Sequence, residues 1–310
     1  MAGKQISETV VERVMKLESS KLRIEVLPEV GGKISQIALK PDEKQLLIPP
    51  QKPYVTIPPG GSWMDYDMSG MDDCFPIIAS GIYPCDPWKG TEFRPLGEWV
   101  YGRWEVIAPA KEGRILMRRR GERLPYLAFK TVSLSADDTL RLDYKVENHG
   151  GCSLRYIWAL HPLIQVGEAF RLNLAAGEKE FRVYPGKPEF QVWPSYGSID
   201  LSREWIPEGK TLKIFVAGIE EGRCDLLLDS CAIRFLYDTA KQPVLGIWFN
   251  NLGFPPGSQS PFRCIAVEPC SAASDELDEL EPGRYLSIPG HGAVSWSVEL
   301  KIERRTGSEP

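Results

Sequence analysis

The chain has 310 residues, of which 43% are hydrophobic and 25% charged, the balance of a globular protein with a sizeable core. Its formal net charge of −5 argues against a nucleic acid as partner, because phosphate binding needs a basic face. The sequence contains no stretch of about 18 continuous apolar residues that could cross a membrane, and its first eight residues include no apolar signal segment. We therefore expect a cytoplasmic protein with no membrane partner.

Predicted β-strands recur along the chain as short alternating segments, separated by Pro, Gly, Asn and Asp. In chain order they are Val14–Glu18, Leu22–Leu27, Lys33–Ile37, Trp99–Ile107, Arg114–Arg118, Leu127–Leu134, Thr139–Glu147, Leu154–His161, Leu212–Val216, Cys231–Tyr237, Val244–Phe249, Cys264–Glu268 and Val294–Ile302. The acidic segment Ser274–Leu280 is predicted to form one short helix capped by Ser274. Regular strands without alternating helices predict an all-β fold, a large antiparallel β-sandwich. We expect residues 1–310 to form a single domain with a disordered tail at 304–310.

Residues 49–98 differ in composition, because they are rich in proline and also carry tryptophan and tyrosine. Such a segment is too aromatic for a disordered linker, and long ordered loops often carry function. We expect it to be ordered and to line one side of a ligand cleft, although it could also simply cover a sheet edge. The basic cluster Arg118–Arg120 is interpreted as a solvated hairpin end, with a phosphate or acidic-sugar contact as the alternative.

Cysteine and histidine usage bears on metals and redox state. The seven cysteines include no C-x-x-C pair, which favours reduced thiols over a disulfide framework. The three histidines, His149, His161 and His291, form neither H-x-H nor H-E-x-x-H, so we expect no metal and no other cofactor. His149 and His291 lie in glycine-containing turns and are interpreted as turn residues.

His161 and Glu268 are the candidates for acid/base chemistry. Each closes a predicted strand, is followed by proline, and shares its face with small side chains such as Ala159 and Ala266. A histidine and a glutamate placed in this way could flank one bound ligand, as general acid/base catalysis requires. The alternatives are a core histidine bonded to a carbonyl and a buried salt bridge of the glutamate.

Five segments also resemble, in the same order, those of aldose 1-epimerases and their galactose mutarotase-like relatives. They span about Val14 to Lys301 and are Leu27–Ile34, Trp158–Leu163, Gly246–Asn251 with Gly253, Ala266–Cys270, and Ile288–Gly290 before Ala293–Trp296. The second resembles the segment with the family's acid histidine, and the fourth the segment with its base glutamate.

The resemblance implies a galactose mutarotase-like supersandwich that interconverts the α and β anomers of an aldose, as a monomer or homodimer. Glu268 would take the proton of the anomeric hydroxyl, and His161 would protonate the ring oxygen. His161 should then be protonated when the sugar arrives, with a nearby carboxylate or carbonyl that raises or holds its pKa. The remaining candidates are contacts to the sugar's C–H face and to its hydroxyls: Trp99 and Trp248 for the former, and Asp73, Glu98 and Asn250 for the latter. For each tryptophan the alternative is packing in the core.

One position departs from the family pattern. Relatives often have Asp-His-Gly-Glu where this chain has Pro95-Leu96-Gly97-Glu98, so Leu96 replaces a histidine that helps to hold the sugar. This departure keeps a second hypothesis open, a non-catalytic carbohydrate-binding protein on the same fold. A third is a sugar epimerase, isomerase or lyase that reuses the sandwich.

Overall fold

The computed structural model describes residues 13–58, 61–111, 113–175, 179–186, 189–257, 260–278, 280 and 285–305. Within these ranges the helical elements are two 3-10 helices, Trp63–Asp65 and Trp99–Tyr101. The other regular elements are strands, and every pairing between them is antiparallel. No helix in this part of the chain is long and apolar enough to span a membrane.

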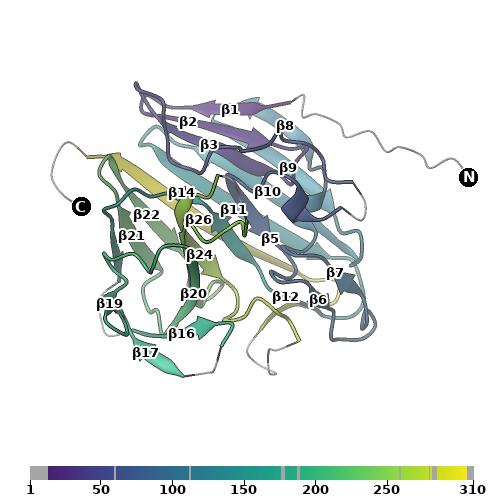
Figure 1. Ribbon diagram of the computed structural model, residues 1–310. Helices are drawn as coiled ribbons and strands as arrows, with labels where there is room; N and C mark the ends of the chain where they lie inside the picture. Colours follow the sequence, from purple (N-terminus) through teal and green to yellow (C-terminus); the bar gives the residue numbers. More distant parts are fainter. Residues whose placement is uncertain are drawn as a thin grey trace, which may run out of the picture.

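Two large sheets make up the fold (Figure 1). The first has 12 strands, in the order β1 (Met15–Glu18), β2 (Leu22–Leu27), β3 (Lys33–Leu39), β5 (Met71–Cys74), β13 (Ala159–Pro162), β24 (Arg263–Cys270), β23 (Val244–Asn251), β20 (Lys210–Ala217), β16 (Glu180–Tyr184) and β17 (Phe190–Val192), with β4 (Lys44–Gln45) beside β3 and β14 (Ile164–Gln165) beside β24. The second has eight, in the order β15 (Arg171–Leu174), β21 (Arg223–Leu227), β22 (Cys231–Tyr237), β26 (Ala293–Arg304), β11 (Thr139–Asn148), β10 (Tyr126–Leu134), β9 (Arg114–Arg120) and β8 (Glu105–Lys111). Three two-stranded sheets pair β12 (Leu154–Tyr156) with β25 (Leu286–Ile288), β18 (Ser195–Tyr196) with β19 (Ile199–Asp200), and β6 (Gly81–Ile82) with β7 (Glu92–Phe93).

The main hydrophobic core draws side chains from both large sheets. Ile247 and Val267 of the 12-stranded sheet belong to the same buried cluster as Leu142 and Val298 of the eight-stranded sheet. Alternation along each strand turns these residues inward and leaves the intervening residues on the outer face. The predicted antiparallel β-sandwich is therefore confirmed.

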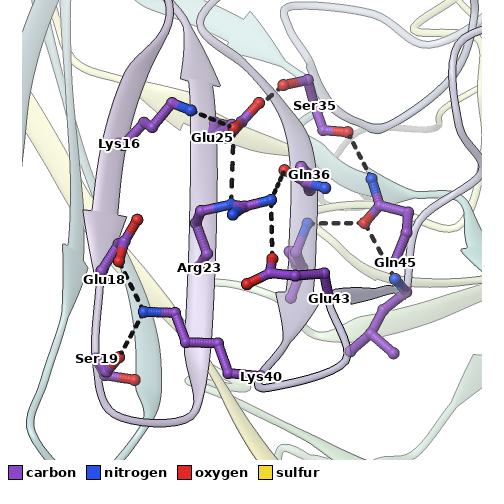
Figure 2. A network of polar contacts seen from close by, with 12 residues as sticks. Lys16, Glu18, Ser19, Arg23, Glu25, Ser35, Gln36, Lys40, Glu43 and Gln45 are labelled. Carbon is purple, nitrogen blue, oxygen red and sulfur yellow. Dashed lines mark hydrogen bonds and ion pairs between the residues drawn. The ribbon is translucent and has the colours of Figure 1, made fainter.

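The outer face of β1, β2 and β3, at one edge of the 12-stranded sheet, carries a network of charged side chains (Figure 2). Lys16 lies directly opposite Glu25, with Nζ and Oε1 3.0 Å apart, and Arg23 reaches Glu43 at 2.8 Å. Cross-strand pairs of opposite charge favour this register, and charges at a sheet edge discourage pairing with other chains.

The predicted strand Leu154–His161 is in fact two strands in different sheets. β12 ends at Tyr156 and pairs with β25, whereas β13 begins at Ala159 and enters the 12-stranded sheet. Between them, the N–H of Ile157 bonds to the carbonyl of Pro76 and the N–H of Trp158 to the hydroxyl of Ser271. The strand is interrupted at these two residues because their N–H groups bond to loops rather than to a neighbouring strand.

Three other predicted element bounds need correction. The strand predicted over Trp99–Ile107 begins as a 3-10 helix, and β8 starts only at Glu105. β24 runs through Pro269 to Cys270 instead of ending at Glu268. The helix predicted over Ser274–Leu280 is absent from the described residues 274–278 and 280, because the carbonyl of Asp275 bonds to the N–H groups of Ile78 and Ala79 instead of continuing a helix.

The proline-rich segment 49–98, of which residues 59 and 60 lie outside the described ranges, is built into the fold. It supplies β5 to the centre of the 12-stranded sheet and buries the rings of Trp63 and Tyr83. At the other end of the chain, Arg304 closes β26 instead of beginning a tail, and residues 306–310 lie outside the described part.

Candidate active site

The candidate site lies on the outer face of the 12-stranded sheet, where β13 runs between β5 and β24. His161 is directly opposite Asp72 of β5, so their side chains share a face. Across β13, Glu268 of β24 points to the same side, and its Oε1 lies 3.6 Å from Nε2 of His161. The two residues that the sequence singles out as an acid/base pair are thus brought together from distant parts of the chain.

Glu268 is fully buried, and its two carboxylate oxygens have different surroundings. Oε2 accepts a hydrogen bond from Lys213 Nζ at 2.8 Å, whereas Oε1 has no hydrogen-bond partner. Burial raises the pKa of this carboxyl, and the Lys213 ammonium acts in the opposite direction. Gly246 lies opposite on β23, where a Cβ would stand 3.3 Å from Oε2, so glycine there leaves room for the carboxylate.

Lys213 and Asp275 complete the group around Glu268, and sequence reasoning did not find them. Lys213 Nζ lies 2.8 Å from Oδ1 of Asp275 as well as from Glu268. Burial disfavours the charge on Lys213, but the carboxylates of Asp275 and Glu268 outweigh it and hold the pKa of the ammonium well above its usual range. The available signal was weak, because Lys213 is a single polar residue between the inward-facing Leu212 and Ile214.

His161 is almost enclosed, with 12% of its side chain exposed. Burial, helped by the Lys213 ammonium, lowers the pKa of the imidazole from 6.5 to about 4. The expectation that a neighbouring carboxylate or carbonyl would raise or hold this pKa is therefore wrong: the attraction of Asp72 and Asp275 does not offset the cost of burying a charged ring. The ring is neutral at neutral pH.

Asp72 provides a second incompletely satisfied carboxylate on the same face. Its Oδ2 lies 2.6 Å from Lys33 Nζ, which also donates to the carbonyl of Ser69, but its Oδ1 is buried without a hydrogen-bond partner. Free acceptor oxygens thus lie on both strands that flank His161, Oδ1 of Asp72 on β5 and Oε1 of Glu268 on β24. Buried acceptors of this kind call for donors from water or from a ligand.

Three of the predicted sugar contacts lie inside the fold, away from this face. The carboxylate of Asp73 points inward and is bound by Lys130 at 2.6 Å and by the hydroxyl of Tyr144 at 2.7 Å. Glu98 accepts hydrogen bonds from the hydroxyl of Tyr126 and from backbone N–H groups. Trp99 is fully buried in the aromatic core. The structure does not bring Asp73, Glu98 or Trp99 to His161.

The other two predicted contacts lie on β23. Trp248 is partly exposed, and its ring centroid is 5.9 Å from that of His161, so the two rings are neighbours on this face. The amide of Asn250 binds the carbonyls of Phe254 and Phe262 and accepts from the N–H of Gly253, which commits it to shaping the adjacent turn. Of the five predicted contacts, Trp248 is the one beside His161.

Leu96, the departure from the family pattern, is buried and has a left-handed backbone with φ of +64°. Its N–H donates to the carbonyl of Ile78, and the N–H of Ile78 donates to the carbonyl of Asp275. Leu96 is therefore connected through one residue to the segment that carries Asp275. Among the described residues, no group of three or more His, Cys, Asp or Glu side chains could hold a metal ion.

Comparison with known proteins identifies the fold. No protein-family model matches the chain, and no curated protein matches its sequence. Among solved structures, the Slr1438 protein from Synechocystis sp. PCC 6803 is similar with a TM-score of 0.71 at 15% identity, covering 98% of this chain and 100% of that one. A galactose mutarotase-like protein from Lactobacillus casei ATCC 334 is similar with a TM-score of 0.69 at 16% identity, covering 94% and 100%. The GalM/aldose epimerase homologue from C. elegans has a TM-score of 0.65 at 11% identity, covering 95% and 99%. At these identities the likeness shows the fold alone, which is galactose mutarotase-like, as the resemblance of its motifs predicted.

Proposed function

We propose that the protein is an aldose 1-epimerase-like isomerase, with Glu268 as base and His161 as acid, which acts as a single domain without a metal or other cofactor in the cytoplasm. The observation that carries the proposal is the 3.6 Å approach of His161 Nε2 to the unpartnered Oε1 of Glu268. A carboxylate oxygen with no donor can take a proton from a sugar hydroxyl, and an imidazole beside it can give a proton to the ring oxygen.

The proposed reaction conserves protons at each step. Oε1 of Glu268 takes the proton of the anomeric hydroxyl, the bond between C1 and the ring oxygen breaks, and the ring oxygen takes a proton from His161. C1 then rotates, His161 recovers its proton as the ring closes, and Glu268 returns its proton to the new anomeric hydroxyl. Because the resting imidazole is neutral, loss of its one N–H proton would leave an imidazolate, so His161 has to take up a second proton before it can serve as the acid.

The free acceptors at the site support a sugar as the ligand. A sugar offers several hydroxyl donors, and Oδ1 of Asp72 and Oε1 of Glu268 are two buried oxygens that lack a donor. Trp248 offers an apolar ring for the sugar's C–H face. We propose Asp72, in place of its inward-facing neighbour Asp73, as the aspartate that binds a sugar hydroxyl. Asp72→Asn should then weaken sugar affinity, measured by calorimetry, while Asp73→Asn should act on stability.

The decisive experiment is polarimetry of a freshly dissolved pure anomer, corrected for the spontaneous rate. Glu268→Gln and His161→Asn should each lower the rate by about 10²- to 10⁴-fold, while sugar binding measured by calorimetry persists. The matched control is Glu25→Gln, which makes the same substitution on the outer face of the same sheet. Glu25 belongs to the charged network at the sheet edge, so its loss should leave the rate unchanged. Wild-type rates in both site variants would contradict the assignment of these residues.

A non-catalytic carbohydrate-binding protein is the second candidate. Leu96 in place of the family histidine and the neutral imidazole of His161 favour it. Sugar binding without any acceleration of mutarotation by the wild-type protein, over a panel of aldoses, would select this function over the first.

A further inference from the structure

Lys213 forms a buried ion triad with two carboxylates. Its Nζ lies 2.8 Å from Oε2 of Glu268 and 2.8 Å from Oδ1 of Asp275, and the three side chains are 11%, 0% and 13% exposed. The triad joins two central strands to a loop, since Lys213 comes from β20, Glu268 from β24, and Asp275 from the segment after β24. Such an arrangement is costly to desolvate, and here one ammonium offsets the charge of two carboxylates.

The loop that carries Asp275 is held firmly. The carbonyl of Asp275 accepts hydrogen bonds from the N–H groups of Ile78 and Ala79, at 3.1 and 2.8 Å. Closer to β24, the N–H of Ser271 donates to the carbonyl of Trp158, and the Ser271 hydroxyl accepts from the N–H of Trp158. Asp275 is therefore fixed by backbone contacts that do not depend on Lys213, and it can orient the ammonium.

Other titratable groups also surround Glu268, but among the described residues no second lysine or arginine contacts it. These groups are His161 on β13, Asp72 and Cys74 on β5, Lys33 on β3, and Cys264 and Cys270 on β24 itself, while β23 contributes the uncharged Gly246 and Trp248. Lys33 is occupied by Asp72 at 2.6 Å. Within the described residues, Lys213 is thus the cation in contact with Glu268.

We propose that Lys213 and Asp275 form a positioning dyad, which keeps Glu268 ionised in its buried site and directs its free oxygen Oε1 toward His161. Lys213 occupies Oε2 and so leaves Oε1 as the basic atom. Asp275 weakens the stabilisation of ionised Glu268 by Lys213, because it shares the ammonium and adds a second negative charge. The catalytic consequence rests on the proposed function, whereas the control of Glu268 ionisation does not.

The dyad makes predictions of opposite sign for its two members. An opposite charge in contact typically lowers the pKa of a carboxyl by about 1–3 units, so Lys213→Met should raise the titration midpoint of Glu268 by that amount. Asp275→Asn removes a like charge and frees Lys213 for Glu268 alone, so it should lower the same midpoint. If Lys213 and Asp275 had only structural roles, their two variants would not shift the titration midpoint of Glu268 in opposite directions.

The test is a ¹³C NMR titration of the full chain labelled at the glutamate carboxyl carbon, with the Glu268 resonance assigned by its loss in Glu268→Gln. We expect an upward shift of the midpoint in Lys213→Met, a downward shift in Asp275→Asn, and no shift in Lys213→Arg, which retains the charge. Lys210→Met, an exposed lysine on the same strand, is the matched control and should also leave the midpoint in place. A midpoint that stays the same in Lys213→Met, or moves in the same direction in both variants, overturns the proposal.

Mutarotation rates at varied pH provide the second arm. The acidic limb of kcat/KM should follow the NMR midpoint, so that Lys213→Met loses activity at neutral pH and recovers it in alkaline solution. A limb that does not follow the midpoint overturns the catalytic half of the proposal. If the wild type accelerates no aldose, the proposed function fails, and the NMR titration still decides on the dyad. If Lys213→Met does not fold, Asp275→Asn decides alone, and a midpoint that stays or rises there refutes the dyad.

Discussion

Replacing Lys130 by methionine tests the ion pair at the centre of the sandwich. Lys130 and Asp73 are each 1% exposed at the side chain, and Nζ lies 2.6 Å from Oδ2. Lys130 also donates to the carbonyl of Gly32 at 2.9 Å, while the hydroxyl of Tyr144 donates to Oδ1 of Asp73 at 2.7 Å. Methionine keeps the length of the side chain but leaves the Asp73 carboxylate buried with the Tyr144 hydroxyl as its remaining donor.

The expected cost can be worked from this geometry. Removing one partner of a buried pair costs about 3–5 kcal/mol, because an uncompensated charge remains. At about 2.1 cal/mol/K per residue, a chain of 310 residues unfolds with an entropy of about 0.65 kcal/mol/K, so a loss of ~4 kcal/mol lowers Tm by about 6 °C. Adding Asp73→Leu to Lys130→Met should recover much of this loss, since apolar replacements of buried pairs are often neutral.

Scanning calorimetry and urea unfolding measure this effect directly. The control is Arg118→Met, which breaks an exposed pair with Glu105 (44% and 63% exposed) and should lower stability far less, because solvent screens the pair. A loss in Lys130→Met no larger than in the control would refute the reasoning. If Asp73→Asn weakened sugar binding without lowering stability, Asp73 would be a sugar contact, as the motif resemblance implied.

Three further predictions concern the site. Gly246→Ala should slow mutarotation with the fold intact, because the added Cβ would stand 3.3 Å from Oε2 of Glu268. Polarimetry measures the rate and circular dichroism the fold, and an unchanged rate would contradict the close fit. The pKa of His161 is lowered from 6.5 to about 4, so the unfolded chain takes up this proton first as the pH falls. Unfolding free energies should therefore drop between pH 6.5 and 4, by up to about 3 kcal/mol, and His161→Asn should flatten that part of the curve; parallel curves would refute the assignment. The backbone at position 96, with φ of +64°, should tolerate Leu96→His. The histidine should tighten sugar binding or broaden the range of aldoses bound, measured by calorimetry. Unchanged affinities would show that position 96 does not reach the sugar.

Strand periodicity was sufficient to predict the fold class and most strands of the two large sheets. The alternation Leu212, Ile214 and Val216 recurs as inward-facing residues of β20, and the predicted strand Cys231–Tyr237 matches β22. Such patterns are local, because neighbouring side chains in a strand point to opposite faces whatever lies beside them. The same local pattern also put His161 and Glu268 on one face with small residues, although both strands continue beyond them, β13 to Pro162 and β24 to Cys270.

Which residues meet at the site depended on strand order and register, which link distant parts of the chain. Nothing in the run Asp72-Asp73 says which carboxylate faces out, but the pairing of His161 with Asp72 across β5 and β13 does. Lys213 becomes a partner of Glu268 only because β20, β23 and β24 are neighbours in the sheet. A shift of one residue in any of these pairings would move each side chain to the other face, so the tertiary structure alone decided the composition of the site.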